Sequence, residues 1–461
     1  MTSLRRSFSH AFSKEASNVK KEWLLTFGIV VFTAFVTLGT IRFFAPHLLG
    51  VSKDLQLVRV AKKVPPFFDN VFRKQDYESA ELTVQDPFIK RGRPLFNAEF
   101  GVGQGPHDIL GFRNRAVPNA ADVVVIGDST TYGYNVILAQ NWPSRMREAL
   151  GRKRPMVYNM SVAGWGAAEY LAIFDKALVF RPRAVVVAFH SGNDPLETFQ
   201  QAYGNPYYAL LQTASGLKME DIPRVAYPPP KSDWWPVKFK DGVSTIFTPK
   251  LRLLTANQKH PVIQAGWDGM AKAARVMGRL AREHHVKLVF TVIPTKELVY
   301  ADKVAQEGLV PPEDYASLVR DESENILRFR RELEKIPGAV FVDVVAPLRE
   351  AAKRATPLYP EDINSHPAEA GYEVIGRAVA AQMAPLLPEP LEGLVELRRD
   401  RQAPRIYLLR DGKAWFAPSK DILRRNGWML ENIRSIAESE ITRFELAGRV
   451  DKVDPARFGP R

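Results

Sequence analysis

The chain has 461 residues, of which 46% are hydrophobic and 25% are charged, a balance typical of a globular protein with two or three folded units. It contains no Cys, which excludes disulfide scaffolds, thiol nucleophiles and Cys-ligated metal sites. The net charge of +13 comes from basic residues scattered among acidic ones, with clusters at both ends. We therefore attribute it to a solvated surface and to membrane-flanking segments, and we expect no nucleic-acid binding.

The amino-terminal region indicates a membrane anchor. Residues 1–22 are polar and basic, and the uncharged apolar run that begins at Trp23 has about the length of a membrane-spanning helix. No small-residue cleavage site is obvious after it, so we predict a cytoplasmic tail over 1–22 and an uncleaved transmembrane signal anchor over 23–44. Because the preceding residues are basic, the amino terminus is expected in the cytoplasm. The expected location is the inner membrane, crossed once, with the bulk of the chain periplasmic or extracellular.

The next segment, 45–119, is rich in Pro and Gly and is predicted to be an irregular stalk and lead-in. From 120 to 386, short apolar runs alternate with helical patterns, which predicts an α/β domain built on a doubly wound parallel sheet. Residues 200–260 interrupt this alternation and are interpreted as an insertion, whose aromatic residues over 227–236 either contact sugar rings or serve as core filler or a lid. The five expected strands are 122–126, 156–159, 184–189, 286–293 and 339–345.

Beyond residue 386 the composition changes again. Residues 387–400 contain Pro, Glu and Arg and are predicted to be a linker. Ile406–Phe416 has the pattern of a β-hairpin with its turn at Asp411–Gly412, and short helical patterns follow. Residues 401–461 are therefore expected to form a small α+β module.

Candidate catalytic residues follow three of the predicted strands. Ser129 comes directly after the first strand, Gly164 follows the second, and Asn193 follows the third. The carboxyl ends of parallel strands meet at one edge, where ligands bind in open α/β sheets. A Ser nucleophile needs a base and donors for the developing oxyanion, and a glycine N–H and an asparagine amide can supply those donors. Taken singly, each residue is also explained as a helix cap or a turn residue.

The candidate base is His366, in the run from Glu361 to Pro367 just before the last predicted helix. Asp362 is close enough in sequence to orient the imidazole ring, as the acidic member of a triad does. The predicted chemistry requires no metal and no cofactor.

These residues, together with Gly127-Asp128-Ser129 and Gly192-Asn193-Asp194, resemble the SGNH, or GDSL-type, hydrolase superfamily over about 120–385. The resemblance implies an SGNH/flavodoxin-like fold in which the Ser is the nucleophile and the His is the base. It also implies an oxyanion hole formed by the backbone N–H of Ser129, by Gly164 and by Asn193.

One position departs from that family pattern. The family typically has an Asp three residues before the His, and here Ile363 occupies that position. The alternatives are Asp362 in a longer loop, Glu361 one residue further back, or a Ser–His dyad whose ring is held by a backbone carbonyl.

A second resemblance concerns the substrate. The segment Val292–Tyr300, with Tyr359, is similar to SGNH-like proteins that O-acetylate extracellular polysaccharides, such as alginate acetyltransferases. We predict that Lys296 in this segment and Trp165 beside the oxyanion glycine contact the substrate.

The combined prediction is a Ser–His acyl-transfer enzyme that acts on ester groups, foremost O-acetyl groups, of an extracytoplasmic substrate such as a polysaccharide. Ester hydrolysis is favoured. The first alternative is a polysaccharide O-acetyltransferase, which would use the same residues and would need a multi-span membrane partner to deliver the acyl group. The second is a non-catalytic, membrane-anchored binding protein on the same fold.

Overall fold

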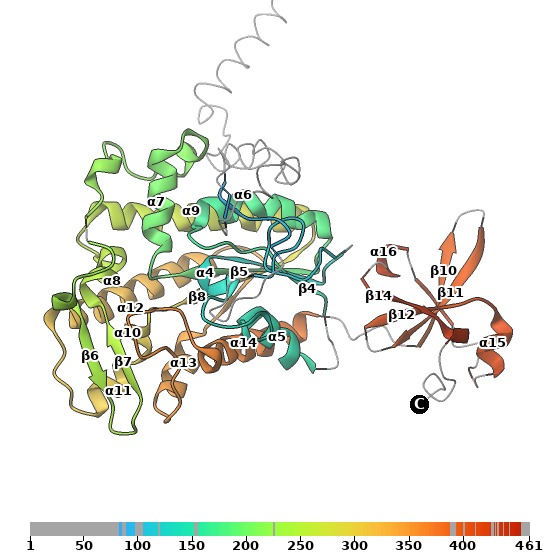
Figure 1. Cartoon of the computed structure of the whole chain (residues 1–461). Coiled ribbons are helices and arrows are strands. Elements are labelled where there is room, and N and C mark those ends of the chain that lie inside the picture. The colour runs from blue at the N-terminus through green and yellow to red at the C-terminus, as the bar shows by residue number, and fades with distance from the viewer. Residues whose placement is uncertain are drawn as a thin grey trace, which may run out of the picture. The chain divides into compact units, whose positions relative to one another are not determined.

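A five-stranded parallel sheet forms the centre of the main domain (Figure 1). Its strands are β3 (Val123–Gly127), β4 (Val157–Asn159), β5 (Ala184–His190), β8 (Lys287–Ile293) and β9 (Ala339–Val342), in the spatial order β4-β3-β5-β8-β9. Both β3 and β5 are buried along their whole length, which explains why their sequences are continuous apolar runs rather than alternating patterns. The predicted five-stranded parallel sheet is confirmed.

The structure is a computed structural model. It describes residues 83–84, 89–96, 105–118, 120–151, 155–224, 226–387, 393–399, 402–410, 412–425, 428, 430, 433–436, 438–441 and 443–452. The predicted cytoplasmic tail and membrane anchor, over 1–22 and 23–44, lie outside these residues. No helix within the described ranges combines the length and the apolar character that a membrane span requires.

Helices cover both faces of the sheet (Figure 1). On one face lie α5 (Trp142–Ala149), α13 (Val345–Ala352) and α14 (Glu369–Met383), and on the other lie α6 (Ala167–Ala177), α9 (Pro261–Glu283) and α12 (Glu313–Glu334). Alternate strand residues point to the two faces. Val186 of β5 belongs to the same buried cluster as Trp142 of α5, whereas Phe189 contacts the rings of Tyr170 and Phe329 on the opposite face.

The strand order places a switch point at β3. The chain leaves β3 to form β4 on one side and then returns to form β5 on the other. In open α/β sheets ligands bind at the carboxyl ends of the strands where the order reverses in this way. The residues that follow β3 and β5 therefore lie where this fold places functional sites.

The predicted insertion has its own secondary structure. It contains an antiparallel hairpin of β6 (Trp235–Lys238) and β7 (Ser244–Phe247), followed by α8 (Pro249–Ala256). Trp235 packs edge-on against Tyr315 of α12, with 4.7 Å between ring centroids. This aromatic residue thus packs against the main domain, whereas Tyr227 is 84% exposed.

The described part of the lead-in is bound to the main domain. Arg113 is buried and donates hydrogen bonds to the carbonyl oxygens of Gly105 at 2.6 Å and of Val136 at 2.8 Å. Asp108 accepts a hydrogen bond from the hydroxyl of Tyr158 at 2.8 Å. Residues 105–118 thus form a lead-in segment that packs with the main domain.

The carboxyl-terminal module is a second, mixed sheet. Its order is β13 (Arg434–Ile436), β10 (Gly393–Arg399), β11 (Gln402–Arg410), β12 (Lys413–Ala417) and β14 (Glu445–Arg449). The hairpin expected within 406–416 is formed by β11 and β12. The linker prediction over 387–400 differs from the structure, because β10 occupies 393–399 and pairs with β11. Two small apolar clusters that share no residue with the main core stabilise this sheet.

The packing of α14 against α5 depends on a glycine. A Cβ atom built on Gly376 would lie 2.7 Å from Cβ of Arg145 and 2.8 Å from both the Met146 nitrogen and the Trp142 oxygen. We expect Gly376→Ala to lower the free energy of unfolding by about 1–3 kcal/mol, because the backbones of the two helices must separate. Urea denaturation measures this. The exposed substitution Gln382→Ala in the same helix should change stability by less than about 0.5 kcal/mol, and equal effects of the two would contradict the account.

Candidate active site

Ser129 lies at the switch point of the sheet, at the start of the short helix α4 (Ser129–Tyr132). Asp128 caps this helix, because its Oδ1 accepts a hydrogen bond from the Thr130 N–H at 2.8 Å. Strand and helix can join this tightly because Gly127 has no side chain: a Cβ there would lie 2.2 Å from Thr131 Oγ1. The local sequence thus holds the Ser129 side chain just beyond the end of β3.

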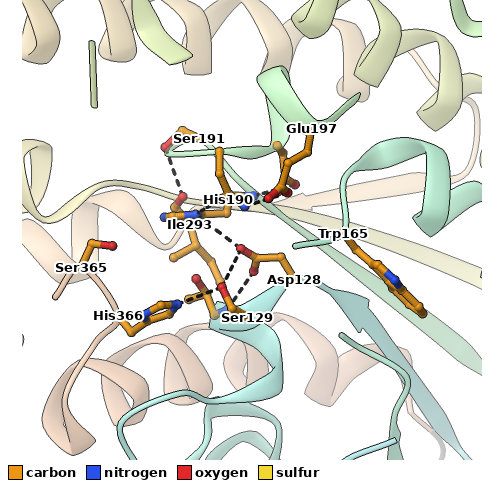
Figure 2. A network of polar contacts seen from close by, with 12 residues as sticks. Asp128, Ser129, Trp165, His190, Ser191, Glu197, Ile293, Ser365 and His366 are labelled. Carbon is orange, nitrogen blue, oxygen red and sulfur yellow. Dashed lines mark hydrogen bonds and ion pairs between the residues drawn. The ribbon is translucent and has the colours of Figure 1, made fainter. Parts of the chain in front are cut away.

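The structure brings Ser129 and His366 together (Figure 2). The Ser129 Oγ and the His366 Nε2 are 2.8 Å apart, although the two residues are 237 positions apart in the chain. The Tyr134 ring stacks on the imidazole, with 5.1 Å between centroids. Burial lowers the pKa of His366 to about 4, so the imidazole is neutral at neutral pH and able to accept the Ser129 proton.

The residue that holds the other ring nitrogen is Asn364. His366 Nδ1 lies 2.8 Å from Asn364 Oδ1. The structure therefore differs from the expectation for Asp362, whose Oδ1 instead accepts the backbone N–H of Asn364 at 2.8 Å. An Asn two residues before the His can reach the ring in a tight turn of the loop, whereas the Asp362 side chain caps that turn.

Asp128 lies between the nucleophile and a second imidazole, that of His190. The Asp128 Oδ2 is 3.3 Å from Ser129 Oγ and 3.5 Å from His190 Nδ1. Burial alone would raise the pKa of Asp128, but its hydrogen bond and charge interaction with His190 and the nearby His366 hold that pKa below its ordinary value. Asp128 is thus a buried carboxylate in direct contact with the candidate nucleophile.

Asn193 joins the same network from the end of β5. Its Oδ1 is hydrogen-bonded to His190 Nδ1, and its Nδ2 donates to Glu197 Oε2 at 2.7 Å. These two contacts fix the orientation of the amide and leave one N–H of Nδ2 to bind a substrate oxygen. Gly164, at φ +76°, lies near Glu197, because a Cβ built on it would be 3.8 Å from Glu197 Oε1. The oxyanion roles of Asn193 and Gly164 stay predictions.

Carboxyl groups are buried beside this amide. Burial raises the pKa of Glu197 to about 8, assisted by the negative charges of Asp128 and Glu169. Burial likewise raises the pKa of Glu169 to about 7 and that of Asp194 well above its ordinary value. At neutral pH Glu197 is mainly in its protonated form, which spares the site part of the cost of buried negative charge.

Trp165 does not reach the candidate site. It is fully buried, its Nε1 donates to the carbonyl oxygen of Lys90 at 2.6 Å, and its ring packs edge-on against Phe112. In Figure 2 the indole points away from Ser129 and His366. The predicted substrate contact of Trp165 therefore differs from the structure, which uses the residue as core.

Lys296 also has a different role from the one expected. Its side chain is fully buried, and Nζ donates to the carbonyl oxygens of Asp362 at 2.8 Å and Asn364 at 3.0 Å, and to Thr245 Oγ1 at 3.2 Å. Burial lowers the pKa of Lys296 to about 8. Rather than facing a substrate, this amine holds the backbone of the loop that carries His366.

The comparisons identify the family to which this arrangement belongs. The model of the GDSL-like lipase/acylhydrolase family matches residues 125–374, more than half of the chain. This chain belongs to that family. No curated protein matches this chain.

Within the described ranges, no group of three or more His, Asp or Glu side chains is arranged to hold a metal ion.

Two solved structures are among those to which this chain is similar. A catalytic mutant of an acetylxylan esterase from Geobacillus stearothermophilus is 13% identical over 58% of this chain and 95% of its own, with a TM-score of 0.33. A GDSL-like lipase from Bacteroides thetaiotaomicron is 13% identical over 57% of this chain and 87% of its own, with a TM-score of 0.30.

The pKa of Glu197 leads to a prediction about stability. The folded protein keeps a proton on Glu197 that the unfolded chain releases, so stability falls as pH rises between the ordinary 4.5 and about 8. Glu197→Gln keeps an acceptor for Asn193 and removes this effect. We therefore expect the melting temperature of the variant to exceed that of the wild type by a margin that grows over this pH interval.

Differential scanning fluorimetry across this interval measures the margin. The exposed substitution Glu283→Gln is the matched control and should show a margin that does not depend on pH. If the difference in melting temperature between Glu197→Gln and the wild type stayed constant with pH, Glu197 would not be buried in its protonated form.

Proposed function

We propose that this GDSL enzyme is an ester hydrolase in which Ser129 and His366 remove acyl groups, foremost acetyl, from an extracytoplasmic glycan. The observation that carries the proposal is the 2.8 Å contact between Ser129 Oγ and His366 Nε2, with the second ring nitrogen bonded to Asn364. A nucleophile, a base and a group that orients the base are the parts that acyl transfer requires.

The chemistry follows from these positions. As Ser129 Oγ attacks the ester carbonyl, its proton passes to His366 Nε2, and negative charge develops on the former carbonyl oxygen. The backbone N–H of Ser129, the N–H of Gly164 and Nδ2 of Asn193 are assigned to that oxygen. His366 then protonates the departing alcohol, which leaves an acyl group on Ser129. Water, activated by the same imidazole, releases the acid and restores the hydroxyl.

The choice of hydrolysis over transfer rests on Lys296. The similarity of Val292–Tyr300 to O-acetylating proteins led to the expectation that Lys296 contacts a glycan. Because its amine is buried and bonded to backbone carbonyls, this segment offers no exposed cation to an acceptor sugar. Water is therefore the favoured acceptor, and an O-acetyltransferase is the alternative that the assay below distinguishes.

Ester hydrolysis by the full-length chain in detergent tests this function. We expect Ser129→Ala to lower kcat/KM for p-nitrophenyl acetate and for an acetylated polysaccharide by at least about 10³-fold, because no other hydroxyl lies against His366 Nε2 within the described residues. The exposed substitution Ser232→Ala should leave the rate unchanged. Equal rates for wild type and Ser129→Ala would refute the proposal, and acetyl transfer to an added glycan in preference to water would favour the transferase.

The proposal also includes the location. The uncharged run over 23–41, within the predicted anchor over 23–44, holds the chain in the inner membrane, and basic residues over 1–22 keep the amino terminus in the cytoplasm. We expect the full-length protein to sediment with membranes and Val30→Asp to shift it toward the soluble fraction, because a charge near the middle of a span costs about 2.5–3.5 kcal/mol.

Protease added to spheroplasts tests the orientation and should digest the main domain. Full protection of that domain would show that it lies on the cytoplasmic side.

A further inference from the structure

The base of the candidate site works in only one of its two neutral tautomers. His366 Nε2 accepts the Ser129 proton only if the imidazole hydrogen is on Nδ1. In a triad with an acidic member, a carboxylate beside Nδ1 ensures this, because an ionised carboxylate can only accept. Asn364 stands at that place here, and an amide presents an acceptor at one end and a donor at the other. Something else must therefore decide which end faces the ring.

The side-chain amides of Asn135 and Asn364 are bonded to each other, and each is also bonded to a backbone group of His366. These two backbone groups fix the orientation of both amides. The His366 carbonyl oxygen can only accept, and it accepts from Asn135 Nδ2 at 3.0 Å. The other end of that amide, Asn135 Oδ1, then faces Asn364 and accepts from its Nδ2 at 2.6 Å. Asn364 must consequently turn Oδ1 toward His366, where it accepts the backbone N–H at 3.1 Å.

Once both amides are oriented, the contact between Asn364 and the imidazole permits only one tautomer of His366. Asn364 Oδ1 lies 2.8 Å from His366 Nδ1, and an oxygen acceptor there requires a hydrogen on Nδ1. Nε2 is then left bare and directed at Ser129 Oγ. Reversing either amide alone would place two acceptors against each other at one contact and two donors against each other at another.

We propose that Asn135 and Asn364 form an uncharged relay that sets the tautomer of His366 and so replaces the carboxylate of the triad. The inference rests on the proposed function of Ser129 and His366 as an acyl-transfer pair. Both Asn residues are positioning residues, since they act through the imidazole.

The backbone supports the relay at both members. Asn135 has φ +73°, a left-handed conformation that Asn adopts more readily than other residues with a side chain. It follows Tyr134, whose ring stacks on the imidazole, so one short segment after α4 contacts both the ring and the relay. Lys296 holds the backbone of the other member through the Asn364 carbonyl oxygen at 3.0 Å.

An uncharged relay has an electrostatic consequence. It offers no negative charge to a protonated imidazole, so the titratable and charged groups that act on His366 are Asp128, which favours the proton, and His190 and Arg252, which disfavour it. Burial, assisted by His190 and Arg252, outweighs the effect of Asp128 and lowers the pKa of His366 to about 4. Burial raises the pKa of the stacked Tyr134, so its hydroxyl is neutral. A carboxylate at position 364 would raise that pKa.

The tautomer is measured directly by NMR of the full-length chain labelled with 15N at His, with the His366 signals assigned from their loss in His366→Gln. We expect a protonated Nδ1 and a bare Nε2 in the wild type. Asn135→Gly keeps the left-handed backbone and removes the amide, so we expect a mixture of tautomers and a fall in kcat of about tenfold with KM unchanged. His285→Gly, at an exposed position with φ +55°, is the matched control and should change neither.

Substitution of the second member separates orientation from charge. Asn364→Leu should lose the tautomer preference and lower kcat by about 10²–10⁴-fold. Asn364→Asp should keep the hydrogen on Nδ1 and move the acid limb of kcat/KM upward by about 1–3 pH units. A wild-type His366 with its hydrogen on Nε2, or an unchanged spectrum in Asn135→Gly, would overturn the relay. Because the spectra do not depend on turnover, an inactive wild type with the expected tautomer would refute the proposed function alone.

Discussion

The contact between Ser129 and His366 depends on the packing of α14 against α5. Ser129 is held by the buried strand β3, whereas His366 lies in the loop that leads into α14, on a part of the chain 237 positions away. Gly376 allows the two helices to approach until backbone atoms are nearly in contact. The position of the imidazole is therefore set by helix packing on one face of the sheet, and the short-range sequence around His366 only adjusts it.

The site is also organised by the need to satisfy polar groups that are removed from water. Asp128, His190 and Asn193 form a connected network in which each contacts the next. Lys296 is buried, yet three of its contacts are to oxygen atoms of the protein. Such networks fix side-chain orientations because every alternative leaves a buried donor or acceptor without a partner. In this enzyme the same requirement positions the base and the amide assigned to the oxyanion.

Much of the fold was predictable because its signals are local. Four apolar β-formers before Gly127 indicate a buried strand, and the alternation of such runs with helical patterns indicates a parallel sheet. The linker prediction over 387–400 differed from the structure because the sequence of β10 has only a weak alternating apolar pattern. This strand is stabilised by its pairing with β11. Its pairing is a long-range property that composition does not report.

The sequence by itself determined the sheet, the family and the pairing of Ser129 with His366, since each depends on residue types and on their order at the strand ends. Tertiary structure alone decided which neighbours serve that pair. Asp362 and Asn364 are both plausible partners by spacing, and only the path of the loop turns the amide toward the ring. Lys296 and Trp165 resemble substrate contacts in the sequence but are buried, because exposure is a property of the packed chain and not of the residue.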